Sequence, residues 1–221
     1  MGVSGTSSTK ALSVPLPREY DAKKDFIWLA TRPWIWIPRL IAIILSLFIL
    51  VARILLQGSS KDTEVHKSLS KALLNTLTDL GPCFIKVGQS LSTRPDLVRR
   101  DWLEELTNLQ DNLPPCSHQK ALEMLSDELG APAHQLFEFF PDRPIASASL
   151  GQVYKAKLKN NYWGAVKIQR SNLEYIIRRD IVIIRFLGIL SSPFLPLNLG
   201  FGLGEIIDEF GRTLFEEIDY E

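Results

Sequence analysis

A stretch of small residues followed by a lysine has the layout of a phosphate-binding element. The stretch consists of Ala146, Ser147, Ala148 and Ser149, and Lys167 follows in the second of two strand-like runs. Small side chains let backbone N–H groups approach phosphate oxygens closely, and a lysine on a nearby strand can reach the same phosphates. Taken alone, these residues favour the alternative, which is an ordinary turn beside a solvated strand lysine.

A second group consists of Lys86, Gly88 and Gln89, in a segment predicted to be helical. Residues three apart lie on one helix face, so the side chains of Lys86 and Gln89 project together. A glycine inside a helix costs about 1 kcal/mol relative to alanine, and it often marks the close approach of another backbone. An amphipathic helix with a polar face is the alternative interpretation.

The third group is a pair of carboxylates, Glu217 and Asp219, near the end of the sequence. Residues two apart do not share a helix face, so the two side chains do not project together from a helix. A solvated acidic helix end is the usual explanation of such a pair.

The charges are balanced overall but unevenly distributed. The 221 residues carry 25 basic and 25 acidic side chains, and residues 1–60 hold seven of the basic and three of the acidic ones. The net charge is therefore +4 for residues 1–60 and −4 for residues 61–221. This balance excludes a uniformly basic nucleic-acid-binding protein and favours contact between the first part and a membrane surface. Cys83 and Cys116 have neither metal-ligand spacing nor a disulfide framework, which indicates a reducing, intracellular compartment.

The most apolar stretch is residues 40–52, which contain no charged residue. Extension to residues 34–56 gives the roughly 20 residues that a membrane-spanning helix needs, but it includes Pro38, Arg39 and Arg53. Tryptophans beside arginines on the N-terminal side are typical of a helix at the lipid headgroup boundary. Three alternatives stay open: a helix that lies on a membrane, one that spans it, and one that is covered by protein.

The elements that must position these residues follow from the apolar periodicity. Apolar residues repeat at helical spacing from residue 61 onward and give way to strand-like alternation near residue 144. Two strands joined by a hairpin turn at residues 159–161 are predicted over residues 152–158 and 162–168. Helices are predicted over residues 69–80, 84–91, 101–109, 117–130, 172–190 and 205–221. The pattern predicts an α+β fold.

The sequence closely resembles the UbiB family of atypical protein-kinase-like proteins, also called aarF-domain-containing kinases. Five blocks in the same order carry the resemblance: residues 80–97, 109–115, 144–156, 165–170 and 216–220. The resemblance implies a kinase-like N-lobe, built from a small antiparallel sheet and helices, with a helical N-terminal extension and no C-lobe. The implied division is a membrane-associating segment over residues 1–60, the extension over residues 61–140 and the lobe over residues 141–221.

The resemblance also implies roles for matched positions. Lys86, Gly88 and Gln89 are similar to the family's Lys-x-Gly-Gln motif, on a helix that folds over the nucleotide pocket. Residues 146–149 resemble its alanine-rich loop, although Ser147 replaces the usual alanine. Lys167 resembles the phosphate-binding lysine, and Glu217 with Asp219 the Glu-x-Asp motif. A poorly solvated ion pair is expected between Lys86 and these carboxylates.

The implied ligand is ATP or ADP with Mg²⁺, whose protein ligands would come from a C-terminal lobe that these residues do not include. The family role is that of a membrane-associated atypical kinase or ATPase in prenyl-quinone or other isoprenoid-lipid metabolism. The chain is expected to be an N-terminal portion, inactive on its own. A non-catalytic membrane-bound scaffold, or one part of a split kinase that pairs with a separate C-lobe or with lipid-biosynthesis proteins, is the alternative. Exposed apolar surface is expected at Phe186, Leu187, Phe194 and Leu195.

Overall fold

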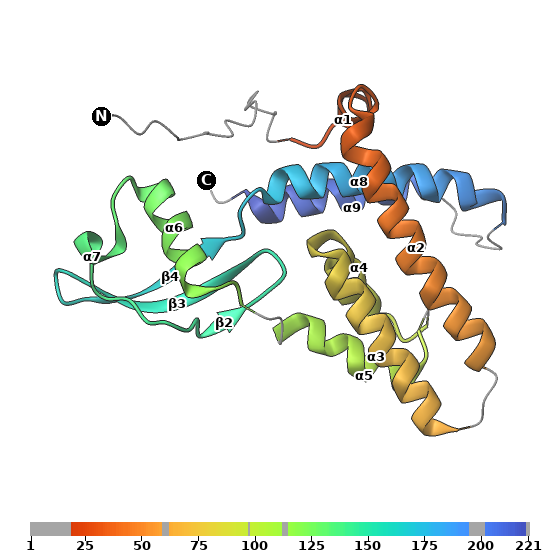
Figure 1. The fold of residues 1–221 in the computed structure, drawn as a ribbon, viewed down its shortest axis with the longest axis horizontal. Coiled ribbons are helices and arrows are strands. Elements are labelled where there is room, and N and C mark those ends of the chain that lie inside the picture. The colour runs from red at the N-terminus through yellow and green to blue at the C-terminus, as the bar shows by residue number, and fades with distance from the viewer. Residues whose placement is uncertain (1–18, 59–61, 97, 112–114, 195–201, 220–221) are drawn as a thin grey trace, which may run out of the picture.

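A computed structural model describes residues 19–58, 62–96, 98–111, 115–194 and 202–219 (Figure 1). A small sheet with two short helices forms one end of the molecule, and the longer helices form the other. The helices are α1 (Ala22–Ala30), α2 (Pro33–Gln57), α3 (Thr63–Leu80), α4 (Pro82–Ser92), α5 (Arg100–Asp111), α6 (His118–Leu129), α7 (Ala133–Leu136), α8 (Leu173–Ser191) and α9 (Leu203–Ile218), with a 3₁₀ turn at Ser192–Phe194.

The sheet is antiparallel and is built around one long strand. Its strands are β1 (Phe137–Phe139), β2 (Ala146–Ser147), β3 (Gly151–Leu158) and β4 (Trp163–Gln169). β1 and β2 pair with opposite ends of one edge of β3, and β4 pairs with the other edge. A small antiparallel sheet combined with helices confirms the predicted α+β class, and it is the architecture that the resemblance to a kinase-like N-lobe implies.

One face of this sheet is covered by α6 and α7, because alternate residues of the strands are apolar there. Side chains from both helices and from the strands form a closed core, which consists of Ala121, Leu125, Ala133, Phe137, Tyr154, Ala156 and Ile168. Since side chains alternate between the two faces of a strand, the intervening residues of β3 and β4 lie on the opposite, open face.

Glycine, proline and serine residues mark the end of α3, the start of α4 and both ends of α6, where the sequence predicts a boundary. Gly81, with a φ of 93°, separates α3 from α4, which begins at Pro82. The Ser117 hydroxyl accepts a hydrogen bond from the N–H of Lys120 at the start of α6, and Gly130 ends α6 at a φ of 68°. Such positive φ angles are easily adopted by glycine.

Two boundaries at the candidate site differ from the expectation. The predicted helix over residues 205–221 ends at Ile218, because Asp219 has an extended backbone. The small-residue stretch is not entirely a loop, since Ala146 and Ser147 form β2 against Val153 and Gln152. The side chain of Phe194 and residue Leu195 lie outside the described residues. Of the other apolar surface candidates, Phe186 is 49% exposed and Leu187 is partly buried.

The second core lies among the longer helices and includes the N-terminal ones. α8 and α9 pack side by side, and α3, α4 and α5 pack against one another next to them. Leu29 of α1 and Ile43 of α2 are buried in the same cluster as Phe84, Ile177 and Leu214. Residues 19–58 are therefore packed on the rest of the molecule.

Candidate functional site

The open face of the sheet carries the predicted phosphate lysine. Val153 of β3 pairs with Ala146 on one side and with Lys167 on the other. Directly paired residues of an antiparallel sheet point to the same face, so Ala146 and Lys167 lie together on the open face. Both are exposed to solvent.

The other loop residues are placed differently. Ser147 pairs with Gln152, on the covered face, and its buried hydroxyl has no hydrogen-bond partner among the described residues. Ser149 is 3% exposed, whereas Ala148 is exposed and closes the turn through its N–H, which donates to the carbonyl of Gly151 at 2.8 Å. Of the four predicted loop residues, the structure therefore brings only Ala146 and Ala148 to solvent.

Lys86 and Glu217 meet, as the resemblance implies. The Lys86 ammonium of α4 forms an ion pair with the Glu217 carboxylate of α9, 131 residues further along the chain. The Lys86 side chain is 22% exposed and that of Glu217 is 38% exposed. The expectation of a poorly solvated pair is therefore wrong, since water reaches both groups. Asp219 is exposed and lies just beyond the end of α9.

Gly88 and Gln89 fix α4 against its neighbours. A Cβ atom at Gly88 would lie 2.4 Å from a methyl of Leu109 and 2.8 Å from a methyl of Leu77. The glycine therefore marks close packing, as predicted, but against leucine side chains of α5 and α3 and not against a backbone. The side-chain amide of Gln89 donates to the carbonyl of Leu109 at 2.7 Å, so Gln89 holds the end of α5.

A single hydrogen bond joins the lysine strand to the acidic motif. The side-chain amide of Gln169, two residues after Lys167, donates to the carbonyl of Ile218 at 3.0 Å. Residues two apart share a strand face, so Gln169 and Lys167 project to the same side of β4. The strand with Lys167, the helix end with Glu217 and the helix with Lys86 are thus brought together.

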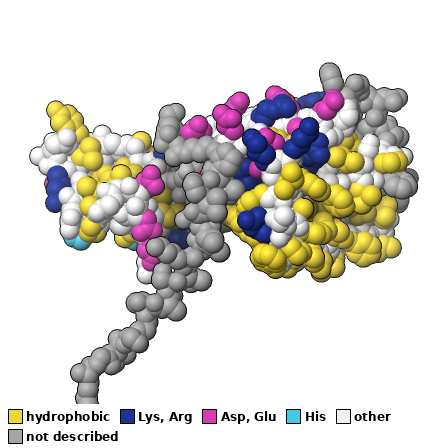
Figure 2. Space-filling model, turned by 90° about the horizontal axis from the view of Figure 1, so that it is seen from above, with side chains coloured by type: hydrophobic (Ala, Val, Ile, Leu, Met, Phe, Trp, Pro, Cys, Tyr) yellow, Lys and Arg dark blue, Asp and Glu magenta, His cyan; other side chains and the backbone are white. Residues whose placement is uncertain are grey.

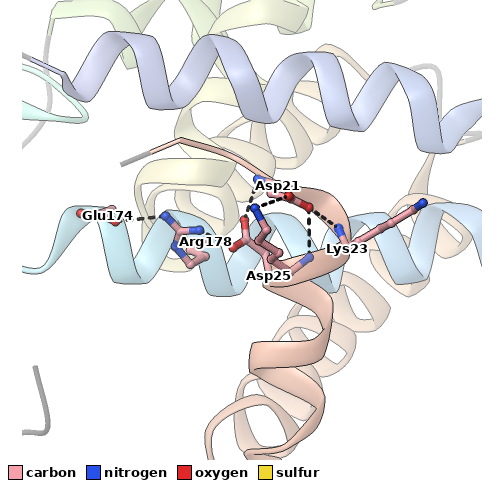
Figure 3. Close-up of polar contacts among 6 residues, drawn as sticks. Asp21, Lys23, Asp25, Glu174 and Arg178 are labelled. Atoms are coloured by element: carbon pink, nitrogen blue, oxygen red, sulfur yellow. Dashed lines mark hydrogen bonds and ion pairs between the residues drawn. The ribbon is translucent and has the colours of Figure 1, made fainter. Parts of the chain in front are cut away.

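A buried ion-pair network, which sequence reasoning missed, ties α1 to α8. Figure 3 shows Asp25 of α1 and Arg178 of α8 pointing toward each other, with Glu174 on the far side of the guanidinium. Asp25 is 2% exposed and Arg178 is fully buried. Burial raises the pKa of the Asp25 carboxyl and outweighs the lowering by Arg178. Only the spacing of Glu174 and Arg178, four apart on a helix, was visible in the sequence.

A second network ties α2 to α8. The guanidinium of Arg39 donates to both carboxylate oxygens of Asp180, at 2.9 and 2.6 Å, and also to the carbonyl of Leu80. Asp180 is fully buried and accepts a further bond from Arg179 at 2.9 Å. Sequence reasoning left open whether Arg39 faces lipid or protein, and the structure pairs it with Asp180, with 18% of its side chain exposed. No short-range spacing could have indicated a partner 141 residues away.

The accessible residues of the open face fit a phosphate group in part. Lys167 supplies a cation, and the side chains of Ala146 and Ala148 are small and exposed, while the Ala148 N–H is already bonded to the carbonyl of Gly151. The orphaned hydroxyl of Ser147 points to the covered face, so it does not fit a role as a phosphate ligand. No group of three His, Cys, Asp or Glu side chains within the described ranges could hold a metal ion.

The family model of the ABC1 atypical kinase-like domain matches residues 108–221. The uncharacterized protein slr1919 of Synechocystis sp. is 43% identical over 204 residues, which are 92% of this chain and 36% of that protein. The chloroplastic Protein ACTIVITY OF BC1 COMPLEX KINASE 1 of Arabidopsis thaliana is 42% identical over 72% of this chain and 24% of its own length. A probable protein kinase UbiB of Pseudomonas aeruginosa is 34% identical over 86% of this chain and 31% of its own length.

Among solved structures, the complex of Rv3197 with erythromycin from Mycobacterium tuberculosis matches 71% of this chain and 40% of that chain. Its sequence identity is 31% and its TM-score is 0.39. The chain spans 24 to 36% of the length of the three curated relatives named above. The family model matches more than half of the 221 residues, on the part that carries the sheet, α8 and α9. The chain therefore belongs to the family of ABC1 atypical kinase-like proteins, whose members include proteins named UbiB.

Proposed function

We propose that this chain supplies the nucleotide-binding lobe, and the helical extension that covers it, of an atypical kinase or ATPase. The ligand is ATP or ADP with Mg²⁺. One observation carries the proposal: three distant blocks of the sequence meet beside the open face of the sheet. Lys86 pairs with Glu217, and Gln169, which shares a strand face with Lys167, binds the carbonyl of Ile218.

Each block has a physical task in this proposal. Lys167 binds the phosphates as a point charge, and the backbone around Ala146 and Ala148 lies close to them because the side chains are small. The pair of Lys86 with Glu217 holds α4 and the rest of the extension beside this face. Bound Mg²⁺ would neutralise phosphate charge, and in kinases its ligands come from a second lobe.

The metabolic role and the location of the whole protein are also proposals. Relatives named as a UbiB kinase and as a chloroplastic kinase support an intracellular protein. We propose that it acts in prenyl-quinone or other isoprenoid-lipid metabolism, together with other lipid-biosynthesis proteins. α2 is long and apolar enough, by length and composition, to enter a membrane, which supports membrane association through residues 1–60.

Nucleotide binding is tested by the thermal unfolding of the 221-residue chain with ATP or ADP, each with and without Mg²⁺. Nucleotide is expected to raise the melting temperature, because a ligand that binds only the folded state stabilises it. Lys167→Ala should remove most of this shift, and Lys159→Ala, in the exposed hairpin turn, should retain it. An equal shift in wild type and Lys167→Ala would overturn the assignment of Lys167.

Turnover is tested separately, by phosphate release from ATP. We expect no turnover by the purified 221-residue chain, because kinases take their catalytic aspartate and metal ligands from His-Arg-Asp and Asp-Phe-Gly motifs of a second lobe, and neither motif occurs in these 221 residues. Clear activity that Lys167→Ala abolishes would contradict this expectation and would place the whole catalytic apparatus within these residues.

A further inference from the structure

α2 has two faces of similar composition but opposite environment. A narrow stripe that includes Ile43 and Leu50 is buried against the other helices. The opposite side of this 25-residue helix is apolar and in water, with exposed fractions between 41 and 84%. Its members are Trp34, Ile37, Ile41, Ile44, Leu45, Phe48, Ile49, Val51, Leu55 and Leu56. Figure 2 shows hydrophobic side chains gathered on one side of the helical part of the molecule, with Lys and Arg beside them.

Both ends of α2 are held by the same body of protein. Before α2, Asp25 pairs with Arg178, and the Tyr20 hydroxyl donates to the carboxylate of Asp208 at 2.7 Å. After α2, α3 leads directly into α4, which packs against α8. A helix that crossed a bilayer would place these two ends on opposite sides of the membrane. The buried pair of Asp25 and Arg178 would then have to separate.

The neighbour of α2 also opposes a spanning arrangement. α3 runs beside α2 in the opposite direction (Figure 1). It exposes Lys67, Lys71, Asn75 and Asp79, which follow one another at helical spacing along one face. Charged groups in the hydrocarbon core cost several kcal/mol each, so α3 cannot accompany α2 across it.

We infer that α2 lies in the plane of one membrane leaflet, with its exposed apolar face in the lipid and both of its ends on the side of the sheet and α8. The inference rests on the membrane association proposed above. A helix of 25 residues is about 37 Å long, and one that lies flat buries a single apolar face between the headgroups. Arg39 needs no lipid partner in this arrangement, because Asp180 already binds it.

Charge favours an anionic leaflet over a second copy of the chain as the occupant of this face. Among residues 19–58, Arg39 and Asp25 are used in ion pairs to α8. The remaining charged side chains there are four basic (Lys23, Lys24, Arg32, Arg53) and two acidic (Glu19, Asp21). Two copies joined face to face would bring like charges together, whereas anionic headgroups attract them.

The first experiment measures co-sedimentation of the full 221-residue chain with preformed vesicles. Binding to vesicles of phosphatidylcholine and phosphatidylglycerol is expected to exceed binding to phosphatidylcholine alone. Ile41→Glu/Phe48→Glu should lower the bound fraction about tenfold or more, because both side chains are at the centre of the apolar face. The control Asn75→Glu/Gln135→Glu adds the same charge at exposed sites on α3 and α7 and should bind like the wild type.

The second experiment measures the topology of the vesicle-bound chain with a membrane-impermeant maleimide. Lys23→Cys and Glu64→Cys, each with Cys116→Ser, place a thiol at an exposed site before and after α2. Cys83 is fully buried, so it does not react in the folded chain. Both new thiols are expected to be modified completely without detergent. Protection of one of them until the vesicles are dissolved would show a spanning helix and overturn the inference.

The outcomes separate the inference from the proposal on which it rests. If the chain binds vesicles and one thiol is protected, the in-plane arrangement is wrong and membrane association stands. If the chain does not bind vesicles of either composition and forms a dimer that Ile41→Glu/Phe48→Glu dissociates, the apolar face binds a second copy. The in-plane arrangement and the proposed membrane association are then both wrong.

Discussion

At the scale of single residues, the ion pairs of this molecule differ in how much water they retain. Lys86 and Glu217, in the candidate site, are both partly solvated. Asp25 and Arg178, which join α1 to α8, are almost completely buried. Removal of one partner is costly only where the other cannot be hydrated. The two pairs should therefore respond very differently to substitution.

The partly solvated pair is expected to contribute little to stability. Lys86→Met and Glu217→Gln are each expected to lower the free energy of unfolding by about 1 kcal/mol or less. Urea denaturation of both single variants and the double variant measures the coupling between the two groups. A coupling above about 3 kcal/mol would indicate a desolvated pair and contradict the exposure of Glu217.

The buried pair is expected to behave in the opposite way. Asp25→Ala removes the buried carboxylate that pairs with the fully buried Arg178 guanidinium, and should cost about 3 kcal/mol or more of unfolding free energy. Glu174→Ala is the matched control, because the Glu174 side chain is 37% exposed and its removal should cost about 1 kcal/mol or less. Chemical denaturation measures both, and equal losses would refute the difference.

At the scale of elements, local signals predicted much of the fold and of the site. Apolar spacing, Gly81 with Pro82, and Ser117 with Gly130 give α4, α6 and the end of α3 close to their observed bounds, whereas α3 begins at Thr63, six residues before its predicted start. Which side chains of the short strand β2 point to the covered face could not be predicted. The direction of Ser147 depends on its register against Gln152, and a shift of one residue would reverse it.

Gly88 shows how one position sets the approach of three helices. Gly88→Ala would place a methyl group against Leu77 and Leu109, which are 5% and 0% exposed and have little room to move. The expected loss of about 1 to 3 kcal/mol outweighs the gain in helix propensity. Gly164→Ala in β4 is the control, since nothing lies within 4 Å of a Cβ atom there. A Gly88→Ala variant as stable as the wild type in thermal unfolding would disprove the crowding.

At the scale of the whole molecule, the long-range contacts decide the arrangement, and they could not be predicted. The partners of Arg39 and Asp25 on α8 are 141 and 153 residues away, and no periodicity encodes such a distance. The family resemblance predicted the meeting of Lys86 with Glu217 only because it supplied information from outside this chain. The N-terminal ion pairs had no such support.

Cys83 is expected to report on the integrity of the whole helical part. Burial raises the pKa of its thiol, so the thiol of the folded chain stays protonated as the pH rises from about 7 to about 9. The stability linked to this group is fully present below the pKa of the unfolded thiol and is lost above it. Alkylation of Cys83 should therefore follow unfolding by urea, as read by mass spectrometry. Rapid alkylation of the folded protein would contradict its burial.

The distance between the partners of the buried pair also has a consequence for synthesis. A ribosome adds about 5 to 20 residues per second, so Arg178 follows Asp25 by about 8 to 30 s. During that interval α2 has left the ribosome, but α8, which must bind Arg39, does not yet exist. Even the stripe of α2 that is later buried is then uncovered. The nascent chain therefore exposes the whole apolar surface of α2 before the kinase-like lobe is synthesised. A bilayer or a chaperone that binds α2 must do so in those seconds, before the chain can fold.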